Sequence, residues 1–212
     1  MNQFGIDVFV YNECFKSRAH EKPNWTYIEA GANDGIRDSI TIEFERQLGW
    51  SGILVEPIPQ LLDVCKTHRS ADKNLFLNCG LGSEYGYFDL TVPRMNLDNA
   101  SFAMSQAHLD QLDGFGQLAA GIVQISCLTL TYADVCRLNG HKPIDLLVLD
   151  VEGFENPILE RMVMDIHEQK VAPPTVVVCE HFWSDQARMR EIMSEHYDLI
   201  KTYEHDYVFH LK

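Results

Sequence analysis

The stretch "YIEAGANDGIRDSITIEFE", from Tyr27 to Glu45, decides the fold of this chain. It opens as a short apolar strand, passes through small and polar residues, and then takes on helical spacing. The small residues Gly31, Ala32 and Gly35 allow a tight strand-to-helix turn, against whose backbone a ligand can lie. Acidic side chains stand beside them, which indicates that this ligand is not simply a phosphate.

Outward from this stretch, apolar runs alternate with helical patterns. Strands are predicted at 25–30, 51–57, 74–80, 123–130, 144–152 and 174–181, and helices at 36–48, after Pro59, at 131–140, after Pro157 and after Asp185. Such alternation predicts an α/β, Rossmann-like fold with a doubly wound, mostly parallel sheet. The last stretch, 197–212, reads as two strands around a tight turn, so we expect a C-terminal antiparallel hairpin.

The chain contains no internal repeat and no linker, and its 212 residues fit one domain spanning 1–212. Residues 93–121 break the pattern, because they lack clear periodicity and three glycines punctuate them. Long loops in compact domains are often functional lids. We therefore expect a lid or insertion at about 93–121.

The composition restricts the classes of partner that this chain is expected to bind. The net charge is −14, and the 17 Lys and Arg residues form no run, so no nucleic-acid partner is expected. The apolar runs are too short to span a membrane. No secretory signal and no C-x-x-C pair among the six cysteines are visible, which favours a cytoplasmic location with reduced thiols. The sequence carries no signal for an oligomeric state.

A second acidic residue strengthens the case for a nucleoside ligand. "GILVEP" ends in Glu56, 25 residues after Gly31, where a carboxylate can bind both hydroxyls of a ribose. A nicotinamide dinucleotide and S-adenosylmethionine then compete as ligands. The turn lacks the G-x-G-x-x-G spacing of a dinucleotide site. Glu29 would oppose a pyrophosphate but suit a cationic sulfonium with its ammonium group, so S-adenosylmethionine is favoured.

Larger blocks carry a family resemblance. "YIEAGANDGIRDSITIEFERQLGWSGILVEPIPQLLDVCKTHR", with the later "LNCGLGS", "LTLTYADV" and "IDLLVLDVEGFENPIL", resembles the FkbM family of S-adenosylmethionine-dependent methyltransferases from about Tyr27 to Leu159. Members typically O-methylate hydroxyls, often on sugars or polyketide-type natural products. The resemblance implies a small-molecule or glycan acceptor. Alternatives are a protein or nucleic-acid methyltransferase, or a catalytically silent S-adenosylmethionine-binding module.

The chain departs from the family pattern in two places. Val148 stands where the family usually has a lysine, two residues before the aspartate of D-V-E-G. The segment that begins at Leu130 reads Leu-Thr-Tyr in place of the usual Leu-Asp-Asp. Nucleic-acid methyltransferases that modify ribose need lysines near the reacting hydroxyl, so Val148 argues against that class.

The cofactor-binding residues are expected at the ends of the first strands. The turn would hold the methionine end of S-adenosylmethionine, Glu56 the ribose, and the backbone around Cys79 and Gly80 the adenine. The full expected set is Glu29, Gly31, Asn33, Asp34, Gly35, Ser39, Glu56, Cys79, Gly80 and Asp150.

The methyl group should lie above the ends of the fourth and fifth core strands, where Asp150, Glu180 and His181 are the predicted catalytic residues. His181 could act as general base, since imidazole titrates near neutral pH. In the alternative, Asp150 and Glu180 hold Mg²⁺, which prefers oxygen ligands and would acidify the acceptor hydroxyl. Glu152 is placed beside them, with capping of the following helix as the alternative, and the pair Phe182 and Trp183 could cover a substrate, with core packing as the alternative.

Overall fold

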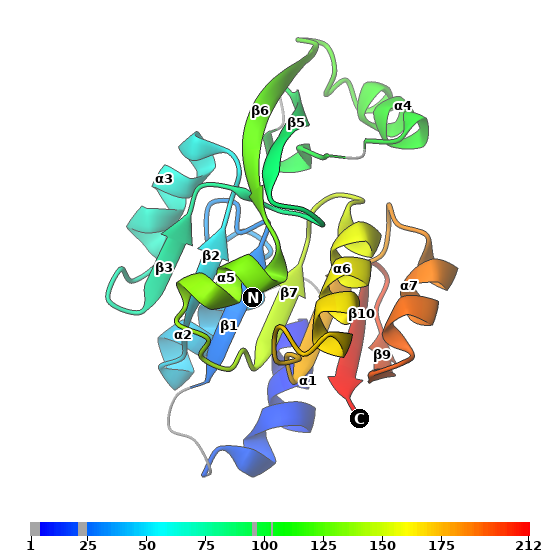
Figure 1. Ribbon diagram of the computed structural model, residues 1–212. Coiled ribbons are helices and arrows are strands. Elements are labelled where there is room, and N and C mark those ends of the chain that lie inside the picture. Colours follow the sequence, from blue (N-terminus) through cyan, green and yellow to red (C-terminus); the bar gives the residue numbers. More distant parts are fainter. Residues whose placement is uncertain (1–4, 21–24, 95–96, 103) are drawn as a thin grey trace.

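The computed structural model describes residues 5–20, 25–94, 97–102 and 104–212. Its main sheet has seven strands in the order β3-β2-β1-β7-β8-β10-β9 (Figure 1). The strands are β1 (Thr26–Ala30), β2 (Ser51–Val55), β3 (Asn74–Leu77), β7 (Leu146–Leu149), β8 (Val176–Glu180), β9 (Tyr197–Thr202) and β10 (Asp206–Leu211). All neighbouring pairs are parallel except those of β10 with β8 and with β9. The predicted doubly wound sheet and C-terminal hairpin are confirmed.

Helices cover both faces of this sheet. One apolar core packs under α5 (Tyr132–Leu138), α6 (Glu155–His167) and α7 (Gln186–Met193). The other packs under α1 (Ile6–Val10), the π-helix η2 (Tyr11–Phe15), α2 (Ile42–Leu48) and α3 (Pro59–His68), and a 3-10 turn, η3 (Lys16–Arg18), follows η2. Because both faces are covered, β7 is buried along its whole length.

Strand order reverses next to β1. Ala30 at its end is paired with Val55 of β2 on one side and with Leu149 of β7 on the other. In open α/β sheets the crevice outside the carboxyl ends of the strands, at this reversal, receives the ligand. The sheet therefore presents the turn after β1 where a ligand would bind. In the helices that the structure describes, no stretch combines the length and the apolar character that crossing a membrane requires.

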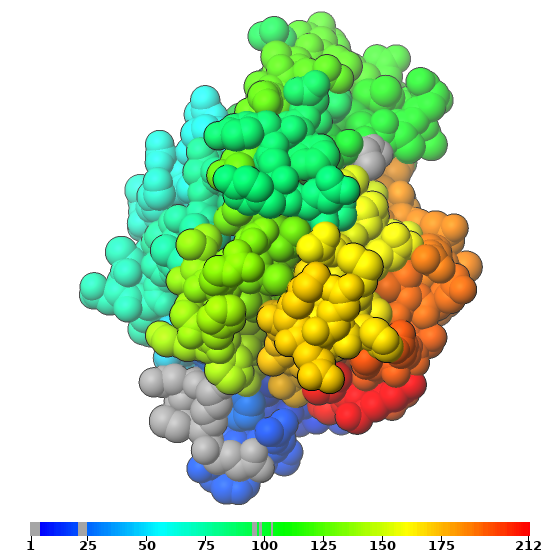
Figure 2. Space-filling model, viewed as in Figure 1, coloured from blue at the N-terminus to red at the C-terminus, as the bar shows by residue number. Residues whose placement is uncertain are grey.

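The predicted insertion is more ordered than its sequence suggests. A second sheet, β4-β6-β5, is built from β4 (Gly80–Leu81), β5 (Gly86–Pro93) and β6 (Ile122–Leu130). Between β5 and β6 lie the 3-10 turn η4 (Leu97–Asn99) and α4 (Gln106–Gly114). This segment forms the upper end of the molecule in Figures 1 and 2. Residues 95, 96 and 103 of the predicted lid lie outside the described residues.

One predicted helix starts later than expected. Its periodicity begins at Ile36, but α2 begins at Ile42. The intervening residues wrap around a buried carboxylate instead: Ser39 and Thr41 each donate a hydroxyl hydrogen bond to Glu29. Asp38 has a φ of 55°, which is incompatible with a continuous right-handed helix. Of the apolar residues that suggested a helix face here, Ile40 is buried but Ile36 is exposed.

Candidate functional site

A cleft of about 450 Å³ opens at the carboxyl ends of the central strands. The ends of β1, β2, β7 and β8 line one side, and residues of η4 and α4 line the other. This volume lies in the range of sites for small molecules and cofactors. Of the predicted site residues, the cleft is lined by Glu29, Gly31, Asn33, Ser39, Glu56, Gly80, Asp150 and Glu180.

The turn after β1 is packed tightly against the end of β7. Gly31 has a φ of +83°, and a Cβ added there would overlap the backbone carbonyl of Asp150. Only glycine satisfies both conditions without strain. Gly31 thereby brings the turn and Asp150 together at one end of the cleft.

Glu29 is held by the turn that follows it. Its carboxylate accepts hydrogen bonds from Ser39 Oγ at 2.9 Å, Thr41 Oγ1 at 2.6 Å and the backbone N–H of Ile40 at 3.0 Å. Arg69 Nη1 lies 3.3 Å from the same carboxylate. Both oxygens are thus engaged by the protein, so direct contact between Glu29 and a cationic ligand stays a prediction.

Arg69 is a structural residue that the sequence analysis missed. Its side chain is fully buried, and its Nε donates to Glu45 Oε2 at 2.6 Å while Nη2 donates to the hydroxyl of Tyr27 at 2.8 Å. With Glu29 and Glu45 on either side, this guanidinium joins β1, α2 and α3. A lone arginine at the end of a helix carries no sequence signal of this role, because its acidic partners are distant in the chain.

Glu56 ties the end of β2 to the same turn. Its Oε2 accepts a hydrogen bond from the Asn33 backbone N–H at 2.9 Å, and its Oε1 accepts one from Ile58 N–H at 2.8 Å. The residue is only 4% exposed, yet it lines the cleft. Each carboxylate oxygen has a second lone pair, so Glu56 can also accept from a ligand hydroxyl.

Three predicted cofactor residues do not line the cleft. Asp34 Oδ1 accepts the backbone N–H groups of Ile36 and Arg37, which folds the turn. Gly35 packs so closely against α3 that a Cβ would clash with Cys65. Cys79 is buried in the core, and burial raises the pKa of its thiol to about 12. The structure gives these residues a part in shaping the site and no direct face on it.

Four carboxyl groups gather at the ends of β7 and β8, namely those of Asp150, Glu152, Glu180 and Asp206. Asp150 opens onto the cleft, but protein surrounds its other sides, and this desolvation together with Glu152 holds its pKa well above the usual range. Desolvation and Asp150 likewise raise the pKa of Glu180, and desolvation raises that of Asp206 to about 6. Among the described residues, Glu180 Oε2 is buried without a hydrogen-bond partner. The charge of His205 opposes the rise in the pKa of Asp206, and His108 Nε2 lies 3.8 Å from Glu152 Oε2.

His181 faces away from this group. Its ring packs on Tyr207 with centroids 4.1 Å apart, and its Nε2 lies 3.3 Å from the carbonyl oxygen of Tyr203. The residue is 5% exposed and does not line the cleft, and burial lowers its pKa. His181 directly follows β8 and packs on Tyr207 outside the cleft lining, so its role as general base stays a prediction.

The predicted metal site has two oxygen-bearing residues in place but no third. Asp150 and Glu180 both line the cleft. Over the part of the chain that the structure describes, they form no group with another His, Cys, Asp or Glu whose ligand atoms all lie within 4.8 Å. Their raised pKa values also mean that a cation would first have to displace protons. A bound Mg²⁺ at Asp150 and Glu180 remains a prediction.

Several lining residues come from the insertion and were not foreseen individually. Trp183 stacks on His108 of α4, with ring centroids 3.9 Å apart and planes 8° apart. Asn99 donates from Nδ2 to Glu152 Oε1 at 3.2 Å, which ties η4 to the cleft. The predicted capping role of Glu152 falls to Glu155, whose carboxylate accepts the N–H groups preceding α6. The sequence signal for the aromatic part of this lining was the pair Phe182 and Trp183, directly after β8.

Another part of the cleft lining combines aromatic rings with amide groups. These residues are Gln111, Phe115, Gln117, Phe182, Trp183 and His205. Phe182 contacts both of its ring neighbours edge-on, with centroids 4.7 Å from Trp183 and 4.7 Å from His205. This wall offers flat apolar faces together with hydrogen-bonding groups.

Comparison with known structures supports the fold. The chain aligns with the FkbM methyltransferase from Methylobacillus flagellatus KT at a TM-score of 0.52 and 13% identity, covering 90% of this chain and 44% of that one. It aligns with the METTL16 MTase domain at 0.53 and 9% identity (98% and 66% covered), and with the human methyltransferase 10 domain containing protein at 0.50 and 8% identity (100% and 83% covered). The chain thus spans less than half of the bacterial structure's length. A comparison with curated proteins found no match.

The family assignment rests on a match of the sequence to a family model. A family model described as "Methyltransferase FkbM domain" matches residues 29–209, which is nearly the whole chain and includes the turn after β1, the carboxyl groups and the hairpin. The chain belongs to the FkbM methyltransferase domain family of S-adenosylmethionine-dependent methyltransferases.

Proposed function

We propose that this chain transfers a methyl group from S-adenosylmethionine to a hydroxyl group of a sugar, a glycan or a small natural product. The observation that carries the proposal is the charge of the cleft. Among the described lining residues, Arg37 is the one Lys or Arg, against seven carboxylates: Glu29, Asp38, Glu56, Asp150, Glu152, Glu180 and Asp206. Such a surface offers a phosphate backbone one positive side chain, whereas phosphate binding relies on several.

The donor end of the cleft fits a cationic nucleoside. Desolvation and the neighbouring carboxyl groups raise the pKa values of Asp150 and Glu180, and Glu180 Oε2 has no hydrogen-bond partner in the described structure. A ligand that carries a sulfonium and an ammonium group would supply positive charge beside them. Glu56 would then accept hydrogen bonds from the ribose hydroxyls, and Gly80 would face the adenine with its backbone.

The acceptor end of the cleft fits a neutral, hydroxyl-rich molecule. The rings of Phe115, Phe182 and Trp183 offer flat surfaces for the C–H faces of a sugar or a polyketide. The amides of Gln111 and Gln117 can donate and accept hydrogen bonds with hydroxyl groups.

When bound, S-adenosylmethionine supplies an electrophilic methyl carbon to this cleft. Asp150 and Glu180 line this cleft, and the positive charge of the bound cofactor would favour their ionised forms, so that either carboxylate could accept the proton of the acceptor hydroxyl. Packing of α4 over the cleft would exclude water and align the acceptor. Val148, buried at the cleft floor, adds no cation that could activate a ribose hydroxyl.

The test is release of S-adenosylhomocysteine with panels of acceptors: neutral glycans and hydroxylated natural products, RNA, and peptides. We expect turnover with the first panel, insensitive to chelator, and a loss of roughly 100-fold or more in Asp150→Asn. Asp89→Asn, an exposed aspartate on β5, is the matched control and should keep full activity. Turnover only with RNA or peptides would contradict the acceptor class. Cofactor binding without turnover on any panel would indicate a binding module. Activity that is lost with chelator and restored by Mg²⁺ would establish a metal requirement.

A further inference from the structure

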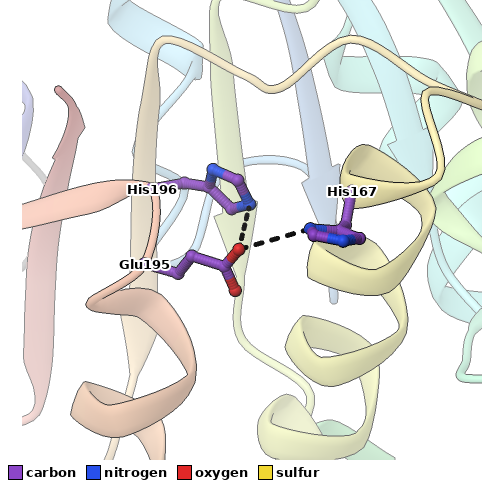
Figure 3. A group of neighbouring side chains, drawn as sticks. All are labelled: His167, Glu195 and His196. Carbon is purple, nitrogen blue, oxygen red and sulfur yellow. Dashed lines mark ion pairs between the residues drawn. The ribbon is translucent and has the colours of Figure 1, made fainter.

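A second cluster of ligand-bearing side chains lies far from the cleft. His167 is the last residue of α6, and Glu195 and His196 lie in the turn between α7 and β9 (Figure 3). Both helices start at the carboxyl ends of β7 and β8, where the cleft opens, so their C-termini reach the opposite edge of the sheet. The cluster is therefore independent of the methyl-transfer site.

The spacing of the three side chains matches a coordination sphere. Glu195 Oε1 lies 3.3 Å from His167 Nδ1 and 3.6 Å from His196 Nε2. One ligand atom from each residue can be chosen so that all lie within 4.8 Å of one another. In a tetrahedral site with bonds of about 2.0 Å, ligand atoms are roughly 3.3 Å apart. Two of the three spacings are thus already close to the required value.

In the described part of the chain, one buried nitrogen of the cluster lacks a hydrogen bond. His196 Nε2 is buried and makes no hydrogen bond within the described ranges 5–20, 25–94, 97–102 and 104–212. Buried polar atoms normally find a partner, and 3.6 Å to Glu195 Oε1 is longer than a hydrogen bond. His167 and Glu195 are 73% and 54% exposed, so their side chains can move toward a common centre.

The backbone that carries these side chains is fixed. The N–H of His196 donates to Met193 O at 3.2 Å, and its carbonyl accepts from the N–H of Lys212 at 3.0 Å. The end of α6 is closed by the bond from Glu168 N–H to Met164 O at 2.9 Å. In addition, α6 and α7 both direct their C-termini toward the cluster, and the partial negative charge of helix C-termini favours a cation.

We propose that His167, Glu195 and His196 bind a divalent first-row transition metal of the Zn²⁺ class, with water completing the coordination. Two imidazoles and one carboxylate suit such a cation, whereas Mg²⁺ and Ca²⁺ require oxygen ligands. The bound metal would join the end of α6 to the turn before β9 and so stabilise the C-terminal part of the sheet.

The chain offers Zn²⁺ few competing sites. All six cysteines are free but buried. Burial raises the pKa of the Cys14 thiol to about 11 and that of Cys65 to about 12, and zinc binds the thiolate. Zinc bound to the folded protein should therefore report on the histidine cluster.

Calorimetric titration of ZnCl₂ into the full chain, stripped with chelator and free of a histidine tag, tests the proposal. We expect about one equivalent to bind, with affinity reduced at least about tenfold in His167→Ala and in His196→Ala. His20→Ala, which removes an exposed histidine elsewhere, should bind zinc as the unmodified chain does. Absence of binding to the unmodified chain, or equal affinity in the cluster variants, would overturn the proposal.

A thermal readout separates loss of ligand from loss of fold. Zinc should raise the unfolding temperature of the unmodified chain and of His20→Ala, and leave that of Glu195→Gln nearly unchanged. His167 is largely exposed, so His167→Ala should keep the unfolding temperature of the metal-free chain. An equal zinc-induced rise in Glu195→Gln and in the unmodified chain would contradict the assignment of Glu195.

Discussion

At the end of β2, the Glu56 carboxylate accepts two backbone N–H groups and also lines the cleft. We predict that Glu56→Gln weakens S-adenosylmethionine binding by about 5- to 100-fold, because a charge-assisted hydrogen bond to the ribose is lost. Calorimetry measures this affinity. Glu84→Gln, a change at an exposed glutamate, is the matched control. Unchanged affinity in Glu56→Gln would remove Glu56 from the ribose site.

Glu180 should make the stability of the ligand-free protein depend on pH. Its pKa is raised in the folded state by desolvation and by Asp150, so the folded protein holds a proton that the unfolded chain releases above about pH 4. The proton favours folding at low pH, and this advantage is lost as the pH rises toward the raised pKa. We predict that Glu180→Gln, which cannot ionise, gains unfolding temperature over the unmodified chain between about pH 5 and pH 8.

The measurement is a set of thermal melts at several pH values for Glu180→Gln, the unmodified chain and the exposed control Glu84→Gln. The comparison between variants cancels the repulsion that the net charge of −14 adds to both. A difference in unfolding temperature that stays constant with pH would show that Glu180 titrates normally.

The place of a residue in the site could be predicted from the sequence only where the residue lies at the end of a predicted strand. Glu29, Glu56 and Asp150 follow from strand ends that must meet at one edge of a parallel sheet. The packing of His181 on Tyr207 could not be predicted, because Tyr207 comes from β10, distant in the chain. Arg69 was missed because its two acidic partners meet it only in the folded chain.

At the scale of elements, the stability of the turn after β1 depends on Gly31. We predict that Gly31→Ala lowers the free energy of unfolding by about 2–5 kcal/mol, since the new Cβ both requires a left-handed backbone and overlaps the Asp150 carbonyl. Gly121→Ala is the matched control, because its φ is +80° but nothing lies within 4 Å of a Cβ there. Its cost should be about 1 kcal/mol.

Denaturant unfolding of both variants measures these free energies. The difference between them isolates the steric contact, because both substitutions carry the same backbone penalty. If Gly31→Ala proved no more destabilising than Gly121→Ala, the tight packing of the turn on β7 would be wrong.

The insertion should behave as a lid whose helix α4 packs on the cleft through a stacking contact. α4 is joined to the cleft through His108, whose ring lies on Trp183. We predict that amides of α4 exchange hydrogen faster than those of β7, and that Trp183→Ala accelerates the exchange of α4 further. Tyr85→Ala, which removes an exposed ring before β5, should leave α4 unchanged. Protection of α4 equal to that of β7 would identify a packed structural element.

Element boundaries show where sequence patterns fail. The start of α2 was predicted six residues early, because Ile36 and Ile40 have helical spacing but lie in the turn that wraps Glu29. Helix α4 was not predicted, because its exposed and polar residues give little periodicity. The cap at Asp185 was predicted, since Asp185 accepts two backbone N–H groups at the start of α7.

For the molecule as a whole, the alternation of strands and helices was sufficient to predict the sheet, its hairpin and its ligand edge. The full charge of the cleft was not predictable, because Asp38 and Asp206 join the predicted Glu29, Asp150 and Glu180 only in the folded chain. Net charge indicates only an acidic protein, whereas the fold concentrates that acidity at the proposed donor site.

The central claim is that this acidic cleft holds S-adenosylmethionine with its sulfur beside Asp150 and Glu180. A crystal structure of the chain with S-adenosylhomocysteine tests it most directly. The claim predicts the ribose hydroxyls on Glu56, the sulfur at the ends of β7 and β8, and open space from the sulfur toward Phe182 and Trp183. A ligand bound elsewhere, or one whose sulfur faces away from Asp150 and Glu180, would contradict it.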